Sequence, residues 1–438
     1  MLGLGAFLAQ FDVTALVVVL PEIGRDLALG LPGLAWIIDA YSLAFTAALL
    51  AAGALADRYG RRRSLLVGNA VFAAASLACA LAGTAPALWA ARAGQGIGAA
   101  LLITGSLASI AAAFPDPSRR ARAYALIGIL SGVAMALGPT LGSLLAAWFG
   151  WRAIFVANVL PCGLIAPAVP RLVGEGRAGT GIPVDWLGLV LLTGALGLAV
   201  EGCFQLRDPL RCAASLAAGL LLALAFAGRQ SGRAHPLIAP ALVSDRTVRA
   251  VIVLLLAVSA GYWAVLVYLP VFLLAAFGLD AQAAGVALLA ATLPMLVLPP
   301  MGGRMIQTLG WRRSFGSAQA LIAAGNAVLV GAAVVDPSNL AGALAGMAAV
   351  GAGAALAHPQ LSGAIVALAP PETAGMASAV TMVARQGGFA LGVAVLGVLA
   401  PTGPDGTGYA AVFGVAAALG LVGLGACRLL PDGAARER

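Results

Sequence analysis

Residues 53–63 read GALADRYGRRR, and residues 303–313 read GRMIQTLGWRR, at a constant offset of 250 positions. The two segments share a glycine at each of two places, and both end in two arginines. Each segment connects two long apolar stretches of the chain. The chain is therefore interpreted as a duplication whose halves enter a membrane in the same orientation.

The composition places the chain in lipid. Of its 438 residues, 61% are hydrophobic and 10% are charged, and the mean hydropathy is +1.00, which leaves too little polar surface to cover a water-soluble globule. A helix needs about 20 apolar residues to cross the ~30 Å hydrocarbon core. Runs this long and apolar exclude a membrane barrel, because barrel strands alternate. Fourteen stretches qualify as helical spans: 2–22, 34–55, 64–83, 87–113, 122–148, 152–170, 184–204, 212–229, 248–276, 282–303, 314–335, 339–368, 374–400 and 408–430.

The repeat assigns six spans to each half, so the spans 184–204 and 212–229 remain between the halves. The sequence thus predicts an all-α integral membrane protein with two six-helix bundles plus two inserted linking helices. The expected parts are an N-terminal bundle (1–170), a linker with two additional spans (171–235) and a C-terminal bundle (236–438). Parallel halves that rock about a central site are a known solution to alternating access.

The arginines orient the chain. All 25 basic residues are arginine and the formal net charge is +8, a balance that would also suit a nucleic-acid-binding surface. The arginines are not clustered in that way. On the loops of one side and the carboxyl tail lie 19 of them, whereas the opposite loops hold Arg25, Arg152, Arg207 and Arg211. The positive-inside rule therefore predicts cytoplasmic termini, and no nucleic-acid partner is expected.

Neither a removed signal nor a cofactor is expected. The apolar stretch at Met1 follows no basic segment and leads to no small-residue cleavage site, so it is interpreted as the first span. No phosphate-cradling loop is predicted, because no strand is predicted. The five cysteines fit no metal-ligand spacing, and most lie in apolar runs as small hydrophobes; they are Cys79, Cys162, Cys203, Cys212 and Cys427.

The 53–63 segment resembles the signature cytoplasmic loop of the major facilitator superfamily. Asp57 lies at the end of one helix beside a run of arginines, and charge-assisted bonds between them would hold two helices together and release them as the halves move. An arginine cluster that only sets topology is the alternative, but it does not explain Asp57 and the spaced glycines. Gln307 and Thr308 replace Asp57 and Arg58 in the second segment, so its latch is expected to be weaker. The first latch comprises Gly53, Asp57, Arg58, Gly60, Arg61 and Arg62.

Two further motifs lie inside spans. Arg92, Gln95 and Gly96 share one helix face and resemble the superfamily's Arg-x-x-Gln-Gly motif. A cation in mid-membrane costs on the order of 2.5–3.5 kcal/mol, which favours a functional role with a partner; an arginine that only locks helices is the alternative. The fifth span contains a motif that resembles the one that marks exporters of the superfamily. Its proline kinks the helix and its glycines open a close-packing face. The motif comprises Gly132, Gly138, Pro139 and Gly142.

Three segments resemble the fourteen-helix branch of the drug:proton antiporters: Asp12 to Pro21, Trp36 to Tyr41, and Pro370 to Gly397. Together with the superfamily motifs, the resemblance covers nearly the whole chain. It implies a multidrug or antibiotic efflux transporter of the cell inner or plasma membrane. Such a protein would work as a monomer, driven by the proton gradient and without a cofactor.

Asp12 and Asp39 are the main candidates for proton coupling and substrate binding. Asp12 lies about ten residues into its span, near the bilayer middle at ~1.5 Å per residue, where loss of water favours the protonated carboxyl group that a proton carrier needs. Asp39 lies near the outer end of the second span and is expected to be wetter. Either carboxylate could attract a cationic substrate, so we expect proton and cargo to compete.

Several other residues are secondary candidates. Glu201 and His358 could take part in coupling, although Glu201 could be only interfacial and His358 could bond a carbonyl left free by the following proline. For Arg385, helix locking competes with substrate contact. Interfacial anchoring is the alternative for the aromatic members of the expected substrate cavity. That cavity comprises Gln95, Tyr268, Phe272 and Gln386.

The sequence therefore predicts a proton:substrate antiporter that exports drugs, biocides or secondary metabolites, with a lipophilic or cationic small molecule as cargo. An importer or uniporter of a natural metabolite is the alternative, against which Gly138 and Pro139 argue. A channel or a membrane-embedded enzyme would need a filter sequence or a catalytic constellation. Neither is found in the sequence, so no enzymatic activity is expected.

Overall fold

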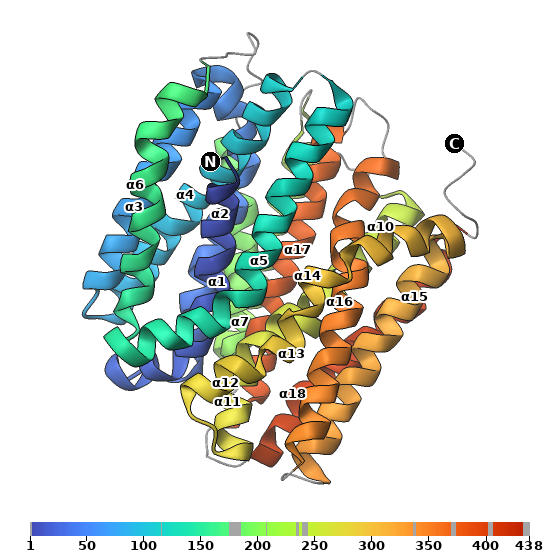
Figure 1. Ribbon diagram of the computed structural model, residues 1–438. Coiled ribbons are helices and arrows are strands. Elements are labelled where there is room, and N and C mark those ends of the chain that lie inside the picture. Colours follow the sequence, from blue (N-terminus) through green and yellow to red (C-terminus); the bar gives the residue numbers. More distant parts are fainter. Residues whose placement is uncertain are drawn as a thin grey trace. The chain divides into compact units, whose positions relative to one another are not determined.

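A computed structural model describes residues 2–114, 116–174, 185–206, 208–233, 236–238, 244–335, 339–368, 374–401 and 406–431. Every regular element in this part of the chain is a helix (Figure 1). The first eight are α1 (Leu2–Asp26), α2 (Leu31–Tyr59), α3 (Arg61–Leu81), α4 (Ala85–Ala113), α5 (Pro117–Phe149), α6 (Arg152–Leu172), α7 (Trp186–Phe204) and α8 (Pro209–Ser231). The others are α10 (Arg246–Val258), η1 (Ser259–Ala264), α11 (Val265–Phe277), α12 (Ala281–Ala287), α13 (Leu289–Thr292), α14 (Pro294–Val297), α15 (Pro299–Val334), α16 (Leu340–Leu368), α17 (Ala374–Leu399), η3 (Gly406–Tyr409), α18 (Ala410–Ala426) and η4 (Cys427–Leu429).

The helices confirm the predicted multi-pass membrane fold. The described residues contain thirteen helices long and apolar enough to cross a membrane. The predicted span 282–303 is not one of them, because it is divided among α12, α13, α14 and the start of α15. The rest of α15 contains the next predicted span, and Gly310 separates the two parts with non-helical backbone (φ 79°, ψ 172°). All fourteen predicted stretches are thus largely helical, and one of them is interrupted.

Prolines coincide with these interruptions. Pro294 and Pro299 lie at the starts of α14 and α15, where a proline loses no intrahelical hydrogen bond. Farther inside a helix the same ring removes one bond and crowds the preceding turn. Between α10 and α11 the chain forms a second irregularity, the π-helix η1, a form that often occurs at functional sites.

The duplicated segments adopt the same local structure. Gly60 (φ 103°) separates α2 from α3, and Gly310 (φ 79°) lies at the matching place in α15. Residues with a Cβ rarely adopt such positive φ angles. The ten residues after each glycine, 61–70 and 311–320, have the same order of buried, half-buried and exposed side chains. The repeat seen in the sequence therefore extends to backbone conformation and packing.

Glycines at matching places bring helices into close contact. A Cβ at Gly96 of α4 would overlap the Tyr41 carbonyl oxygen of α2, and a Cβ at Gly351 of α16 would overlap the Ala291 carbonyl oxygen of α13. Tyr41 and Ala291 are themselves 250 positions apart. Small residues permit this close approach of backbones in membranes, and here it occurs at matching places in both units.

The chain divides into two compact units, Met1–Gly194 and Ala195–Arg438. The division falls within α7, the first of the two helices expected to link the halves. The predicted parts 1–170, 171–235 and 236–438 stay a prediction. In the first unit α1 packs along α5, and α4 packs against both α2 and α3 (Figure 1). In the second unit α15 packs against α16 and α18.

Candidate functional site

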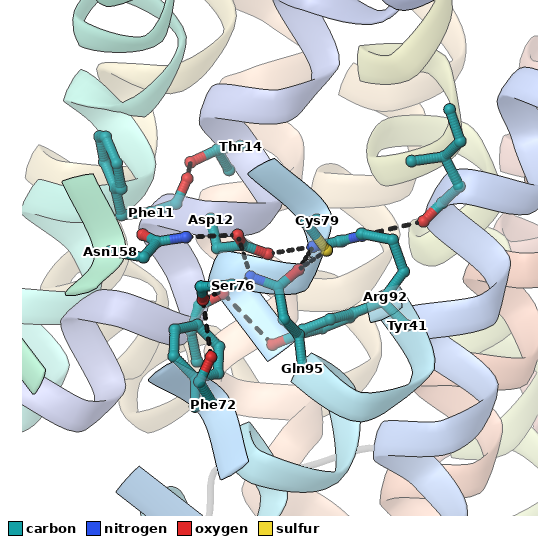
Figure 2. A network of polar contacts seen from close by, with 12 residues as sticks. Phe11, Asp12, Thr14, Tyr41, Phe72, Ser76, Cys79, Arg92, Gln95 and Asn158 are labelled. Carbon is teal, nitrogen blue, oxygen red and sulfur yellow. Dashed lines mark hydrogen bonds and ion pairs between the residues drawn. The ribbon is translucent and has the colours of Figure 1, made fainter. Parts of the chain in front are cut away.

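A buried ion pair joins α1 to α4 inside the first unit (Figure 2). Arg92 Nη1 contacts Asp12 Oδ2, and both side chains are 0% exposed. The sequence indicated that Arg92 needs a partner but did not identify Asp12, which lies 80 positions away. The structure therefore combines two candidates that had been considered separately.

Two amide side chains complete the surroundings of the carboxylate. Asn158 Nδ2 of α6 donates to Asp12 Oδ1 over 2.6 Å, and Gln95 Nε2 of α4 donates to the same oxygen over 3.1 Å. Arg92 donates from Nη1 to Gln95 Oε1 (2.7 Å) and from Nε to the Ile37 carbonyl oxygen of α2 (3.0 Å). Groups from four helices thus meet at one ion pair.

A further layer of side chains holds the amide and the guanidinium in place. From α3, Ser76 Oγ accepts a hydrogen bond from Gln95 Nε2 (2.9 Å), and Cys79 Sγ donates to Gln95 Oε1 (3.2 Å). The Arg92 guanidinium carbon lies 4.6 Å from the centre of the Tyr41 ring, within cation–π range. Figure 2 shows these side chains gathered around Asp12.

Sequence reasoning missed several members of this network. Asn158 carried a usable signal, since a polar side chain in an apolar span commonly has a specific partner. The other three missed residues could not be recognised from the sequence, because small polar and aromatic residues are common in membrane helices. The missed residues are Tyr41, Ser76, Cys79 and Asn158.

The stability of the ion pair depends on both of its members. Moving two charges out of water costs several kcal/mol per ion, and good geometry with additional hydrogen bonds must offset this cost. Removing one member of such a pair costs about 3–5 kcal/mol, because the other charge stays buried. A proton on Asp12 would likewise leave Arg92 without its counter-charge. The network therefore depends on both charges being present.

The exporter motif packs directly beside Asp12. A Cβ at Gly138 of α5 would overlap Thr14 Oγ1 of α1, and a Cβ at Gly142 would lie 2.6 Å from the Ala15 carbonyl oxygen. Gly132 and Pro139, the other members of the motif, are buried within α5. The motif thus places the backbone of α5 against the part of α1 that carries the carboxylate.

Asp39 differs from its expected environment. The sequence predicted a wetter carboxylate, but the side chain is 0% exposed in α2, so that prediction is wrong. It rested on the distance from the end of the span, whereas neighbouring helices cover this face. Neither carboxylate oxygen has a hydrogen-bond partner among the described residues. An isolated buried carboxylate is costly, and such a group takes up a proton or pairs with a cation.

The second unit brings together two other candidates. The Trp263 ring of η1 lies edge-to-face against His358 of α16, with ring centroids 5.5 Å apart. Arg385 of α17 lies within electrostatic range of His358, and its Nη2 donates to Met382 Sδ over 2.9 Å. The sequence did not predict that His358 and Arg385 are neighbours.

The remaining candidates have other surroundings. Glu201 of α7 accepts a hydrogen bond from Gln205, which directly follows the helix. Tyr268 is buried and its hydroxyl donates to a backbone carbonyl of α17, while Phe272 packs against Phe413 with ring centroids 4.9 Å apart. Both aromatic side chains thus lie in the interior of the second unit. Gln386 is half-buried in α17.

Part of the predicted latch lies outside the described residues. The surroundings of Gly53 and the side chains of Asp57 and Arg58 are not described. Pro370, which begins another predicted segment, and the residues up to 373 also lie outside the described residues. Arg61 and Arg62 are half-buried at the start of α3. The latch therefore stays a prediction.

A second polar cluster lies where α1 ends and α6 begins. Asp26 accepts hydrogen bonds from Arg152 Nη1 (2.7 Å) and Trp151 Nε1 (3.1 Å). Glu22 accepts one from the Trp151 backbone N–H (3.3 Å), and Arg152 Nη2 donates to the Ala82 carbonyl oxygen (3.2 Å). Both side chains of the ion pair are over 40% exposed, so the pair contributes little to stability.

An apolar cavity of about 560 Å³ lies between α2, α4 and α7 of the first unit. Small side chains of α2 and larger aliphatic side chains of α4 and α7 line this space, which is open rather than enclosed. Its lining includes Ala44, Ala48, Ile97, Leu101, Leu189 and Val190. Among the described residues, no group of three His, Cys, Asp or Glu side chains could hold a metal ion.

Comparisons with known proteins agree with this architecture. Residues 2–226 and 251–438 match the sequence model of the Major Facilitator Superfamily. The chain is 33% identical to a methylenomycin A resistance protein of Streptomyces coelicolor, over 98% of this chain and 91% of that protein. It is 32% identical to the cephamycin export protein CmcT of Amycolatopsis lactamdurans, over 92% and 84% of the two chains. The multidrug resistance protein Stp of Mycobacterium tuberculosis is 29% identical, over 90% of this chain and 74% of that protein.

Solved structures share the fold at lower sequence identity. A crystal structure of the peptide transporter POT in complex with sulfate has a TM-score of 0.72 at 18% identity, over 99% of this chain and 95% of that chain. The inward open conformation of the xylose transporter XylE from E. coli has a TM-score of 0.69 at 17% identity, over 99% and 96% of the two chains. At these identities the likeness shows the fold alone.

Proposed function

Because the chain belongs to the major facilitator superfamily, we propose that it is a proton-coupled secondary active transporter that exports drugs, biocides or secondary metabolites. Relatives of 29–33% identity are named as export or resistance proteins. The observation that carries the proposal is the buried Asp12–Arg92 ion pair. A charge pair in this position costs free energy, and in transporters such groups mark proton and substrate pathways.

In the proposed mechanism, a proton acts on the ion pair. Protonation of Asp12 removes the counter-charge of Arg92, and the contacts of Asn158 and Gln95 with the carboxylate weaken because a neutral carboxyl group is a poorer acceptor. These contacts hold α1, α4 and α6 together. One protonation event would therefore change how three helices pack.

Asp39 is the second proposed proton-binding group. Its carboxylate is buried and has no hydrogen-bond donor among the described residues, so an exchangeable proton or a cationic group of the cargo would offset the cost of burial. Cargo would take the place of the proton on one side of the membrane and give it up on the other. Asp12 offers less to a cation, since Arg92 already neutralises it.

The exporter motif would pass the change at Asp12 to α5. Gly138 and Gly142 leave no space between α5 and the α1 backbone at Thr14 and Ala15, so a movement of one helix displaces the other. Rocking of the two halves would then open a central site to each side of the membrane in turn.

The membrane location, topology, energy source and oligomeric state of the protein form part of the same proposal. The uneven distribution of arginines supports cytoplasmic termini in a cell inner or plasma membrane. A proton gradient supplies the energy, the working unit is a monomer, and no cofactor takes part. The apolar cavity between α2, α4 and α7 supports a lipophilic cargo.

The proposal is tested by ethidium uptake into everted vesicles that carry the protein, before and after the pH gradient is collapsed. We expect uptake that disappears with the gradient and falls roughly 100-fold in Asp12→Asn, the range typical for loss of a proton-transfer group. Asp208→Asn, which changes an exposed helix cap, is the matched control. Uptake that persists without the gradient, or in Asp12→Asn at matched protein levels, would contradict proton coupling.

A resistance panel separates this function from import of a natural metabolite. Cells that overproduce an exporter are protected against toxic compounds that it carries, whereas an importer sensitises them. Protection by the parent protein, absent in Asp12→Asn, is the expected result. Sensitisation would favour the importer.

A further inference from the structure

The two units differ in how an arginine inside a membrane span is balanced. Arg92 of the first unit has a carboxylate partner, but Arg385 of the second has only Met382 Sδ among the described residues. A thioether is a weak acceptor, and a guanidinium carries five N–H donors. Most of the N–H donors of Arg385 therefore have no acceptor among the described residues, and the residue is half-buried.

A second donor without an acceptor lies in the same unit. Trp263 Nε1 is buried and has no hydrogen-bond partner among the described residues. The ring is fixed between Tyr262 and His358, with ring centroids 5.1 Å and 5.5 Å away, so the N–H cannot easily turn elsewhere. An indole N–H can only donate; unlike most buried donors, this one has no acceptor.

The helices that carry these donors are in close contact. A Cβ at Gly388, one turn after Arg385 in α17, would lie 3.0 Å from Leu256 Cα and 3.2 Å from Ser259 Cβ. Ser259 begins the π-helix that contains Trp263, and its hydroxyl is buried without a partner among the described residues. Arg385 and Trp263 also both lie near His358. The donors thus converge on one region.

The described carboxylates of the second unit have other roles. Asp208, Asp245 and Asp280 cap the first turns of α8, α10 and α12. Glu201 contacts Gln205. Among the described residues, none of these carboxylates is a partner of Arg385, so its guanidinium is available to a carboxylate of a bound molecule.

We propose that the second unit binds a carboxylate group of the cargo at Arg385, with Trp263 Nε1 as a further donor. This rests on the proposed function, because it specifies the molecule that is exported. A carboxylate matches the guanidinium with two parallel hydrogen bonds, whereas a cationic group at this place would be repelled. Cargo that binds here is accordingly an organic acid or a zwitterion with an apolar body, in addition to the cationic cargo proposed for Asp39.

Equilibrium binding of a matched pair of probes tests the charge preference. Purified protein is titrated with tritiated naphthalene-2-acetate and with its primary amide, which has nearly the same shape but no charge. We expect the parent protein to bind the acid roughly tenfold more tightly, and Arg385→Gln to lower this ratio to about one while binding of the amide is kept. Trp263→Phe retains the ring but not the donor, and lowers the ratio roughly threefold.

Two controls keep the result interpretable. Arg249→Gln changes an exposed arginine of α10 and leaves the ratio unchanged, and retained binding of the amide shows that Arg385→Gln is folded. Equal affinity of the parent for acid and amide, or no affinity for the acid, would overturn the inference, as would an unchanged ratio in Arg385→Gln. Binding needs no gradient, so a failure of the inference is separate from a failure of proton-driven export in vesicles.

Discussion

The packing of α4 in the first unit and of α16 in the second follows one pattern, but only α4 carries a charge at its centre. Gly96 and Gly351 approach neighbouring backbones at residues that are 250 positions apart. Four positions before Gly96 lies Arg92, and four positions before Gly351 lies Met347. Both of these side chains are completely buried.

The helices packed against α4 and α16 show the same contrast between a charged and an apolar position. Gly142 packs on Ala15 of α1, and Gly392 packs on Ala260 of η1. Three positions before these alanines lie Asp12 and Ala257. The Asp12–Arg92 pair of the first unit therefore corresponds to Ala257 and Met347 in the second. At this place the second unit packs closely with two apolar side chains, so close packing here does not require an ion pair.

The sharpest test of this comparison replaces Asp12 and Arg92 by the residue types found at the corresponding positions of the second unit. Asp12→Ala alone leaves Arg92 buried without its partner, and we expect the free energy of unfolding to fall by about 3–5 kcal/mol. The double variant Asp12→Ala/Arg92→Met should recover most of this loss, because apolar replacement of a buried ion pair is often neutral or stabilising. Denaturant unfolding of the purified proteins measures both effects.

Export by the double variant distinguishes a role of the ion pair in transport from a role in folding alone. We expect a folded protein that does not accumulate ethidium in everted vesicles. Transport at the parent rate would show that the pair only holds helices together, and the contrast between the units would then concern folding alone.

The glycine contacts should behave alike in both units. Gly96→Ala and Gly351→Ala each place a methyl group on a backbone carbonyl of a neighbouring helix, and we expect each to lower the free energy of unfolding by about 1–3 kcal/mol through overpacking. Gly163→Ala, at an exposed α6 position with no atom within 4 Å of the new Cβ, is the control and should be neutral or slightly stabilising. Thermal unfolding in detergent measures the three variants, and a loss in only one unit would break the correspondence.

The smallest effect is expected at the glycines with positive φ. Gly60→Ala and Gly310→Ala strain the backbone at φ 103° and φ 79°, and each should lower the free energy of unfolding by about 1–2 kcal/mol. If the latch is stronger in the first copy, only Gly60→Ala should also slow export. Equal losses of export in both variants would argue against that asymmetry.

Most of the fold was predictable from the sequence, because long apolar runs have few alternatives in lipid. The positions of thirteen helices and the repeat at 53–63 and 303–313 follow from hydropathy and spacing. The interruption at α12–α14 and the π-helix η1 were not predicted. They depend on prolines and on helix packing, to which average hydropathy is insensitive.

The candidate site was predictable in part. A buried arginine requires a partner, so Arg92 was identified as a site residue, but the sequence does not show which of several distant polar groups it meets. Asp39 was misjudged for a related reason, since its exposure depends on which face of α2 is covered. The pairing of His358 with Trp263 likewise arises from tertiary contacts.

The thiol of Cys79 has a further consequence for experiments. Its S–H group donates to Gln95 Oε1, the side-chain oxygen that also accepts a hydrogen bond from Arg92. The stretching vibration of a thiol absorbs in an infrared region that is almost empty in proteins, and its frequency falls as the hydrogen bond strengthens. Infrared difference spectra of the unlabelled protein would therefore report on the ion pair at each stage of turnover, with Cys79→Ser to assign the band.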